Sequence, residues 1–298
     1  MKNSFSKNKT FNKSLIKNVV GGETPKNKTY KVVKDYELIP NELQSSSKSG
    51  HTVERGGTRK YEIIPIETAK NNIPQKSASK KNIMPKFPFS AVISGRSGSG
   101  KTQLILNMLT RDDLLGNYFH KILVFSPTAN TLDDTYDALK IPAENFIKDF
   151  DPKILDTILT NRKKQITKEG VEKVAKTDRV LLLFDDCISE KKFLESPQNL
   201  KMFTLLRHYL CSVCILSQSF KKIPRSIRLN ANYLAIFPSL QSEINIMLEE
   251  ITPSGISKNE FRDIIAYCTK GRYDFMAINN HAEPNQRIRK NLSEIISF

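Results

Sequence analysis

The sequence predicts an α/β fold in which a mostly parallel central sheet follows a basic, disordered N-terminal tail. Two observations lead to this prediction. Residues 1–82 are rich in Lys, Asn, Ser, Thr and Pro, and they show no sustained helical period or strand alternation. Beyond them, short continuous apolar runs alternate with segments of helical character. Strands that are apolar on both faces and alternate with helices are typical of a parallel sheet that is buried on both sides.

Six apolar runs are expected to form the strands of this sheet. The first runs directly into a glycine-rich turn, and the second, KILVFS, is closed by Pro127, which has no N–H for a strand ladder. The third, RVLLLFD, is the most apolar run in the chain. The predicted strands are residues 89–94, 121–126, 179–185, 212–217, 232–237 and 273–278.

Helical segments separate these strands. The predicted helices are residues 101–110, 131–168, 198–210, 240–250 and 257–269. The second is polar and is interrupted near Pro142 and Pro152, because proline breaks the helical hydrogen-bond ladder. The chain is long enough for one domain of roughly 200 residues with a real core. We therefore expect an ordered domain over residues 83–280, followed by a C-terminal tail over residues 281–298.

The charge of the chain is strongly and unevenly positive. It carries 47 Lys and Arg against 31 Asp and Glu, a net charge of +16. Residues 1–81 alone hold 17 basic and 7 acidic residues, a balance of 17 − 7 = +10. Such a tail favours a polyanionic partner, most simply nucleic acid, although a coding background rich in Lys and Asn explains the same excess without a partner.

Cysteine content and hydropathy indicate a soluble intracellular protein. No apolar run approaches the ~20 residues of a membrane span, and the first residues lack the apolar segment of a signal peptide. Cys211 and Cys214 form a single C-x-x-C inside an apolar run, with no second pair nearby. We interpret them as buried strand residues and not as a zinc or redox site.

The glycine-rich turn after the first strand matches G-x-x-x-x-G-K-[ST], with a strand before it and a helix after it. In this pattern, backbone N–H groups and the helix N-terminus surround phosphate oxygens. Lys101 is expected to reach the β- and γ-phosphates of ATP, and the Thr102 hydroxyl to bind Mg²⁺. The predicted nucleotide-binding residues are Gly95, Arg96, Ser97, Gly98, Ser99, Gly100, Lys101 and Thr102.

A pair of acids at the end of the third strand completes the hydrolytic chemistry. Asp185 and Asp186 follow the run VLLLF, which delivers them to the carboxyl edge of the sheet, where ligands bind. Asp185 is expected to hold Mg²⁺ through water, and Asp186 to orient and deprotonate the attacking water. The sequence contains no N-K-x-D motif for guanine, so the predicted P-loop NTPase uses ATP.

The fourth strand ends in Ser217-Gln218-Ser219. A polar residue at the tip of a strand between the P-loop strand and the acid strand can sense the γ-phosphate. This arrangement indicates the additional-strand type of ATPase, many of which are ring motors.

Four motifs in order carry a specific resemblance: GRSGSGKT, LLLFDD, RHYLCSVCILSQSF and KIPRSIRLNANYLAIF. Over about residues 84–280 the chain resembles the genome-packaging ATPases of the poxvirus A32 type, in the FtsK–HerA superfamily. The resemblance implies a hexameric or pentameric ring that pumps double-stranded DNA into a preformed capsid. It also implies that Gln218 senses the γ-phosphate, and that the protein works in the host-cell cytoplasm, at the viral factory, or with the virion.

A ring motor needs a cation from the neighbouring subunit to stabilise the charge that develops on the γ-phosphate. Arg207, before the sensor strand, is the favoured arginine finger, followed by Arg228 and then Arg225. Lys221, Lys222 and Arg225 are candidate DNA contacts. A helix-end charge or a contact with the phosphate backbone explains each arginine equally simply, and a run of charge like that of the DNA-contact candidates is usually a solvated face.

Two other functions fit the same residues. One is a DNA translocase or helicase that serves replication or conjugative transfer. The other is a nucleotide-gated scaffold, in which the Y-E-x-I-P elements at residues 36–40 and 61–65 of the tail recruit capsid, portal-vertex or membrane proteins. Chance similarity between two weak strands explains the repeat equally well.

Overall fold

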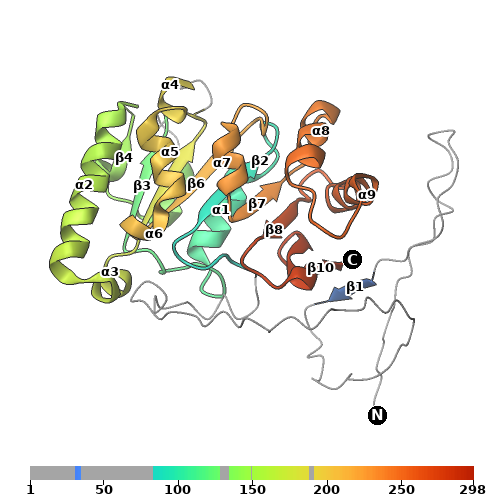
Figure 1. Ribbon diagram of the computed structural model, residues 1–298, viewed down its shortest axis with the longest axis horizontal. Helices are drawn as coiled ribbons and strands as arrows, with labels where there is room; N and C mark the ends of the chain where they lie inside the picture. The colour runs from blue at the N-terminus through green and yellow to red at the C-terminus, as the bar shows by residue number, and fades with distance from the viewer. Residues whose placement is uncertain (1–30, 35–82, 128–133, 149, 188–190) are drawn as a thin grey trace, which may run out of the picture.

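One ten-stranded sheet forms the centre of the molecule, with helices on both of its faces (Figure 1). The computed structural model describes residues 31–34, 83–127, 134–148, 150–187 and 191–298. The strand order is β1-β10-β9-β8-β7-β2-β6-β5-β3-β4. Both Y-E-x-I-P elements lie outside the described residues.

The half of the sheet that holds the glycine-rich turn is parallel throughout, which confirms the predicted α/β class. Five of its strands match the predicted apolar runs to within two residues at either end, and their burial on both faces explains why they are continuously apolar. Its strands are β2 (Ser90–Ser94), β3 (Lys121–Phe125), β4 (Phe146–Ile147), β5 (Val180–Asp185), β6 (Cys211–Ser217) and β7 (Tyr233–Ile236).

The other half is antiparallel, and the sequence prediction is corrected there. Residues 281–298 do not form a tail, because they add two strands to the sheet and bury Ile288 and Ile296. These strands have three and four residues, too short to show a readable period. A strand within the basic tail also pairs with the edge of the sheet. The four strands are β8 (Met276–Asn279), β9 (Ile288–Lys290), β10 (Glu294–Ser297) and β1 (Lys31–Lys34).

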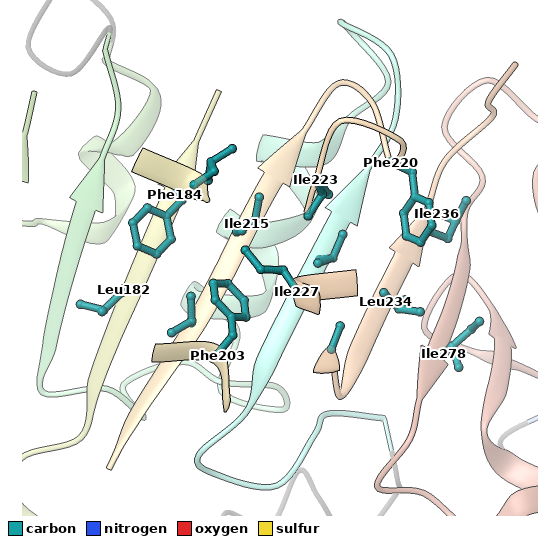
Figure 2. Packing of buried hydrophobic residues seen from close by; sticks show 14 of the residues in the cluster. Leu182, Phe184, Phe203, Ile215, Phe220, Ile223, Ile227, Leu234, Ile236 and Ile278 are labelled. Atoms are coloured by element: carbon teal, nitrogen blue, oxygen red, sulfur yellow. The ribbon is translucent and has the colours of Figure 1, made fainter. Parts of the chain in front are cut away.

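Two apolar layers, one on each face of the sheet, form the core. Along β2, Ala91 and Ile93 face one layer and Val92 faces the other, as the alternation of a strand requires. Figure 2 shows the second layer, in which Phe203 and Ile227 from covering helices pack over the side chains of β5, β6 and β7. The sheet is therefore a rigid base for the loops at its edges.

The helices largely follow the predicted segments, with one clear exception. Residues 134–147 contain only two short 3₁₀ turns and β4, and the long helix begins at Pro152, where Asp151 caps its N-terminus. The α-helices are α1 (Lys101–Thr110), α2 (Pro152–Glu169), α3 (Val171–Thr177), α4 (Lys191–Leu194), α5 (Pro197–Thr204), α6 (Leu206–Tyr209), α7 (Arg225–Asn230), α8 (Gln241–Glu250) and α9 (Lys258–Cys268). The 3₁₀ turns are η3 (Asp134–Leu139), η4 (Ala143–Asn145) and η6 (Pro284–Gln286).

The C-x-x-C pair is structural. Cys211 and Cys214 are fully buried and belong to opposite apolar layers, because residues three apart on a strand point to opposite faces. Burial raises the pKa of the Cys211 thiol to about 11, so it stays protonated. In the described part of the chain, no helix is long and apolar enough to cross a membrane.

Candidate nucleotide-binding site

The glycine-rich turn lies between β2 and α1, at the carboxyl edge of the parallel strands. Its first residue, Gly95, donates its N–H to the carbonyl of Ser217 at the end of β6, at 3.0 Å. A Cβ at Gly95 would lie 2.5 Å from the Cβ of Phe237, closer than side chains approach, so only glycine fits. Gly100 has φ 101°, a left-handed conformation that lets the chain turn into the helix.

Lys101 and Ser99 direct polar groups into this turn. The Lys101 ammonium donates to the carbonyls of Gly95 at 2.8 Å and Arg96 at 3.1 Å. The Ser99 hydroxyl is buried and has no hydrogen-bond partner among the described residues. A buried hydroxyl without a partner beside a cation and a helix N-terminus fits a phosphate oxygen.

The Lys101 ammonium also lies within electrostatic range of the acid pair. Burial lowers the pKa of Lys101, and the negative charges of Asp185 and Asp186 partly restore it. The structure therefore brings the P-loop lysine and both predicted acids together at one edge of the sheet.

Asp185 has a partner that the sequence did not reveal. The hydroxyl of Tyr136, in η3, donates to Oδ2 of Asp185 at 2.6 Å. Burial and the negative charge of Asp185 raise the pKa of Tyr136, so this hydroxyl remains a donor. Nothing in the sequence marks Tyr136, because it lies 49 residues from Asp185 in a segment predicted to be helical.

Asp186 and Gln218 meet because β6 lies between β2 and β5. The side-chain amide of Gln218 donates to Oδ1 of Asp186 at 2.9 Å. Asp186 has φ 53°, an uncommon left-handed conformation that aspartate tolerates and that turns the backbone sharply at the end of β5. The predicted strand order, with the sensor strand inserted beside the P-loop strand, is confirmed.

The donor set at this edge fits Mg²⁺ held mainly by a nucleotide. Thr102 follows Lys101 in the first turn of α1, and Asp185 ends the neighbouring acid strand. The described residues contain no group of three His, Cys, Asp or Glu side chains that would enclose a metal ion. Mg²⁺ commonly takes one or two protein ligands and completes its shell with phosphate oxygens and water, so a hydroxyl and a carboxylate suit it.

Comparison with known proteins decides the family. The model of the family "Poxvirus A32 protein" matches residues 76–289, well over half of the chain. The chain belongs to the poxvirus A32 protein family. This finding confirms the resemblance carried by the four sequence motifs.

Individual relatives share less than a third of their residues with this A32-family chain over the matched region. The "DNA packaging protein OPG160" of monkeypox virus is 27% identical over 200 residues, which cover 66% of this chain and 63% of that protein. The variola virus protein of the same name is 29% identical over 192 residues, 63% of this chain and 67% of that protein. The chain therefore spans somewhat less than two thirds of the monkeypox relative. The solved structure of "the genome packaging NTPase B204 from Sulfolobus turreted icosahedral virus 2 in complex with ATP-gammaS" has a TM-score of 0.47 and 14% identity, covering 68% of this chain and 96% of that chain.

The loop after β6 in this A32-family protein is held by Glu243 of α8. Its carboxylate accepts hydrogen bonds from the Ser219 hydroxyl at 2.6 Å and from the backbone N–H of Lys221 at 2.8 Å. Lys221 and Lys222 are exposed in this loop, at the same edge of the sheet as the P-loop. Their side chains are thus available to a partner that approaches this edge.

Arg228, one of the three predicted arginine-finger candidates, has a different role. Its side chain is 8% exposed, and its guanidinium forms a bidentate ion pair with Glu250, with contacts of 2.7 and 2.6 Å. The same group donates to the carbonyls of Phe220, Lys221 and Ile223. All of these partners belong to its own subunit, so we remove Arg228 from the candidates for a residue that acts on the neighbouring one.

We expect Arg228→Ala to destabilise the fold by about 3–5 kcal/mol, because it leaves the Glu250 carboxylate buried without its cation. Arg225→Ala is the matched control. The Arg225 side chain is 71% exposed and reaches Glu250 only at 3.4 Å, so the expected loss is below about 1 kcal/mol. Urea denaturation of the two variants measures both values. If Arg228→Ala loses as little stability as is expected for Arg225→Ala, the buried ion pair does not stabilise the fold.

Arg207 and Arg225 remain as finger candidates, and they lie at opposite edges of the sheet. Arg225 begins α7 in the loop after β6, whereas Arg207 lies in α6, before β6 begins. The P-loop is at the carboxyl ends of these strands, so α6 lies at the end of β6 away from it and α7 at the end near it (Figure 1).

Proposed function

We propose that this chain is an ATP-hydrolysing motor that translocates double-stranded DNA and packages a viral genome into a preformed capsid. The observation that carries the proposal is the convergence of Lys101, Asp186 and Gln218 at one edge of the sheet. These side chains come from three separate elements, and only the inserted strand β6 brings them together. Membership of the poxvirus A32 family, and relatives that are DNA packaging proteins, support DNA packaging as the use of the hydrolysis.

Each side chain has a defined part in the hydrolysis. The P-loop amides and Lys101 hold the phosphates, which fixes the γ-phosphate in line for attack. Thr102 would hold Mg²⁺ directly and Asp185 through water, and the ion would supply positive charge against the phosphates. Asp186 orients the attacking water and accepts its proton. Gln218, which is hydrogen-bonded to Asp186, senses whether the γ-phosphate is present.

The assembly that we propose is a ring of five or six copies around the DNA. Arg207 is the favoured arginine finger from the neighbouring subunit, with Arg225 as the alternative. Lys221, Lys222 and Arg225 contact the DNA phosphates, and the N-terminal tail, residues 1–82, contacts capsid or portal-vertex proteins. The motor acts in the host-cell cytoplasm, at the viral factory, or in association with the virion.

ATP turnover by the full chain, measured with and without double-stranded DNA, tests the proposal. We expect DNA to raise the rate several-fold and added salt to remove the increase, since phosphate contacts weaken steeply with ionic strength. If the rate of ATP turnover does not change when DNA is added, the proposed motor is contradicted and a nucleotide-gated scaffold is favoured. Virus that lacks this activity should replicate its genome and yet form empty capsids; failed replication would favour a translocase or helicase instead.

A further inference from the structure

A cavity of about 920 Å³ lies beside the P-loop. Gly100 at the start of α1 lines it, together with Phe237 after β7 and Tyr273 and Phe275 before β8. The volume falls within the ~300–1,000 Å³ of ordinary small-molecule sites. None of the predicted nucleotide-binding residues except Gly100 contributes to its wall.

The order of the strands sets the direction in which a nucleotide would lie. Asp186 and Gln218 follow β5 and β6, on one side of the P-loop strand β2. The aromatic residues of the cavity follow β7 and precede β8, on the other side of β2. A nucleotide whose γ-phosphate faces the acid pair therefore points its nucleoside toward β7 and β8, where the cavity is.

Tyr273 presents an aromatic ring at this position. Its side chain is 60% exposed, the most exposed large hydrophobic group in the described part of the chain. Its Cδ1 atom lies 3.6 Å from the place that a Cβ on Gly100 would occupy, so the ring borders the P-loop directly. The guanidinium of Arg272 lies 5.3 Å from the ring centroid, a cation–π contact that orients the ring from one face.

The loop that carries Tyr273 is held firmly by its neighbour Asp274. This carboxylate accepts hydrogen bonds from the backbone N–H of Gly271 at 3.1 Å and from the side-chain amide of Asn291 at 3.2 Å. It also pairs with the Lys290 ammonium at 3.0 Å. The backbone that carries the ring is thus held in place before any ligand arrives, which lowers the entropic cost of stacking on the ring.

Polar and aliphatic side chains line the rest of the cavity. Gln103 and Asn107 are one turn apart on α1 and can face a ligand, whereas the Asn291 amide, after β9, is already bonded to Asp274 and to the backbone N–H of Phe275. Carboxamides donate and accept hydrogen bonds, as the edge of a purine and the hydroxyls of a ribose require. An aromatic platform beside a few amides is the usual composition of a site for a nucleoside.

We propose that this cavity holds the adenosine of the ATP whose phosphates lie in the P-loop, with the Tyr273 ring stacked on the purine. The inference rests on the proposed ATPase function, because it assigns the other end of the same ligand. It makes Tyr273 a binding residue for the nucleoside, with no part in the chemistry at the γ-phosphate.

Equilibrium binding of two probes to the full chain tests the assignment. The probes are a non-hydrolysable ATP analogue and inorganic tripolyphosphate, which has the phosphates but no nucleoside. We expect Tyr273→Ala to weaken binding of the analogue about tenfold, in line with the loss of one base–aromatic stack, and to leave tripolyphosphate binding unchanged. Tyr273→Phe keeps the ring and should bind both probes as the wild type does. Phe298→Ala removes another exposed aromatic ring, 42% exposed and outside the cavity, and should change neither affinity.

Other outcomes distinguish a failure of the nucleoside assignment from a failure of the proposed ATPase function. The assignment is overturned if Tyr273→Ala binds the analogue normally, or if it loses both probes equally. It is also overturned if the wild type binds tripolyphosphate as tightly as the analogue, although the phosphate site would then stand. A wild type that binds neither probe would overturn the proposed ATPase function itself.

Discussion

Lys101→Ala is expected to lower ATP turnover by at least about 10²–10³-fold, the cost of removing one preorganised cation from a developing negative charge. The Lys101 ammonium lies against the carbonyls of Gly95 and Arg96, at the point where α1 begins. The other basic residue of the turn, Arg96, is exposed. Steady-state phosphate release in the presence of double-stranded DNA measures the effect.

The matched control for this variant is Lys164→Ala. Lys164 is an exposed residue of α2, so its loss removes the same charge without touching the site. We expect its turnover to equal that of the wild type, and a binding assay to show weakened nucleotide affinity for Lys101→Ala alone. Normal turnover in Lys101→Ala would refute the hydrolytic role of the P-loop.

Asp186→Asn is expected to lower the rate of the chemical step by about 10²–10⁴-fold and to leave nucleotide affinity nearly unchanged. The amide has the shape of the carboxylate, and its oxygen still accepts the hydrogen bond from Gln218. It cannot accept a proton from water at neutral pH, so the variant should hold ATP without cleaving it. Single-turnover hydrolysis and equilibrium binding, measured on the same variant, separate the two steps.

Comparing Asp185→Asn with Asp186→Asn distinguishes the metal-binding acid from the one that accepts the proton. Asp185 is the proposed metal partner, so this variant should need more Mg²⁺ to reach its maximal rate, and Asp186→Asn should not. If Asp186→Asn, and not Asp185→Asn, needs more Mg²⁺ to reach its maximal rate, the roles of the two carboxylates are exchanged.

The elements that the sequence predicts well are those whose signals are local. The helix after the glycine-rich turn begins and ends where it was predicted, at Lys101 and Thr110. The strand VLLLFD is apolar up to its last residue, Asp185, because both of its faces are buried, so its place inside the sheet is readable from the residues alone. By contrast, β9 and β10 are short strands paired in one antiparallel ladder, and pairing of this kind leaves little trace in the sequence.

The same division applies to the site. The P-loop residues, Asp185 and Asp186 were predicted because each belongs to a short motif whose spacing has a chemical reason. Gln218 was predicted through its position at the tip of a strand, and the strand order confirms that position. Its hydrogen bond to Asp186 joins residues 32 positions apart, so only the register of β5 against β6 determines that the two groups meet.

The sequence by itself determined that this chain is a P-loop protein, because the spaced glycines and the lysine of GRSGSGKT encode their own local backbone shape. Its four ordered motifs carried the resemblance to the poxvirus A32 type. Only the tertiary structure decided which groups surround that loop. It paired Tyr136 with Asp185, committed Arg228 to Glu250, and placed Tyr273 beside Gly100. The physical reason is that these contacts join segments distant in the chain, and their partners are chosen by how the strands are ordered and packed.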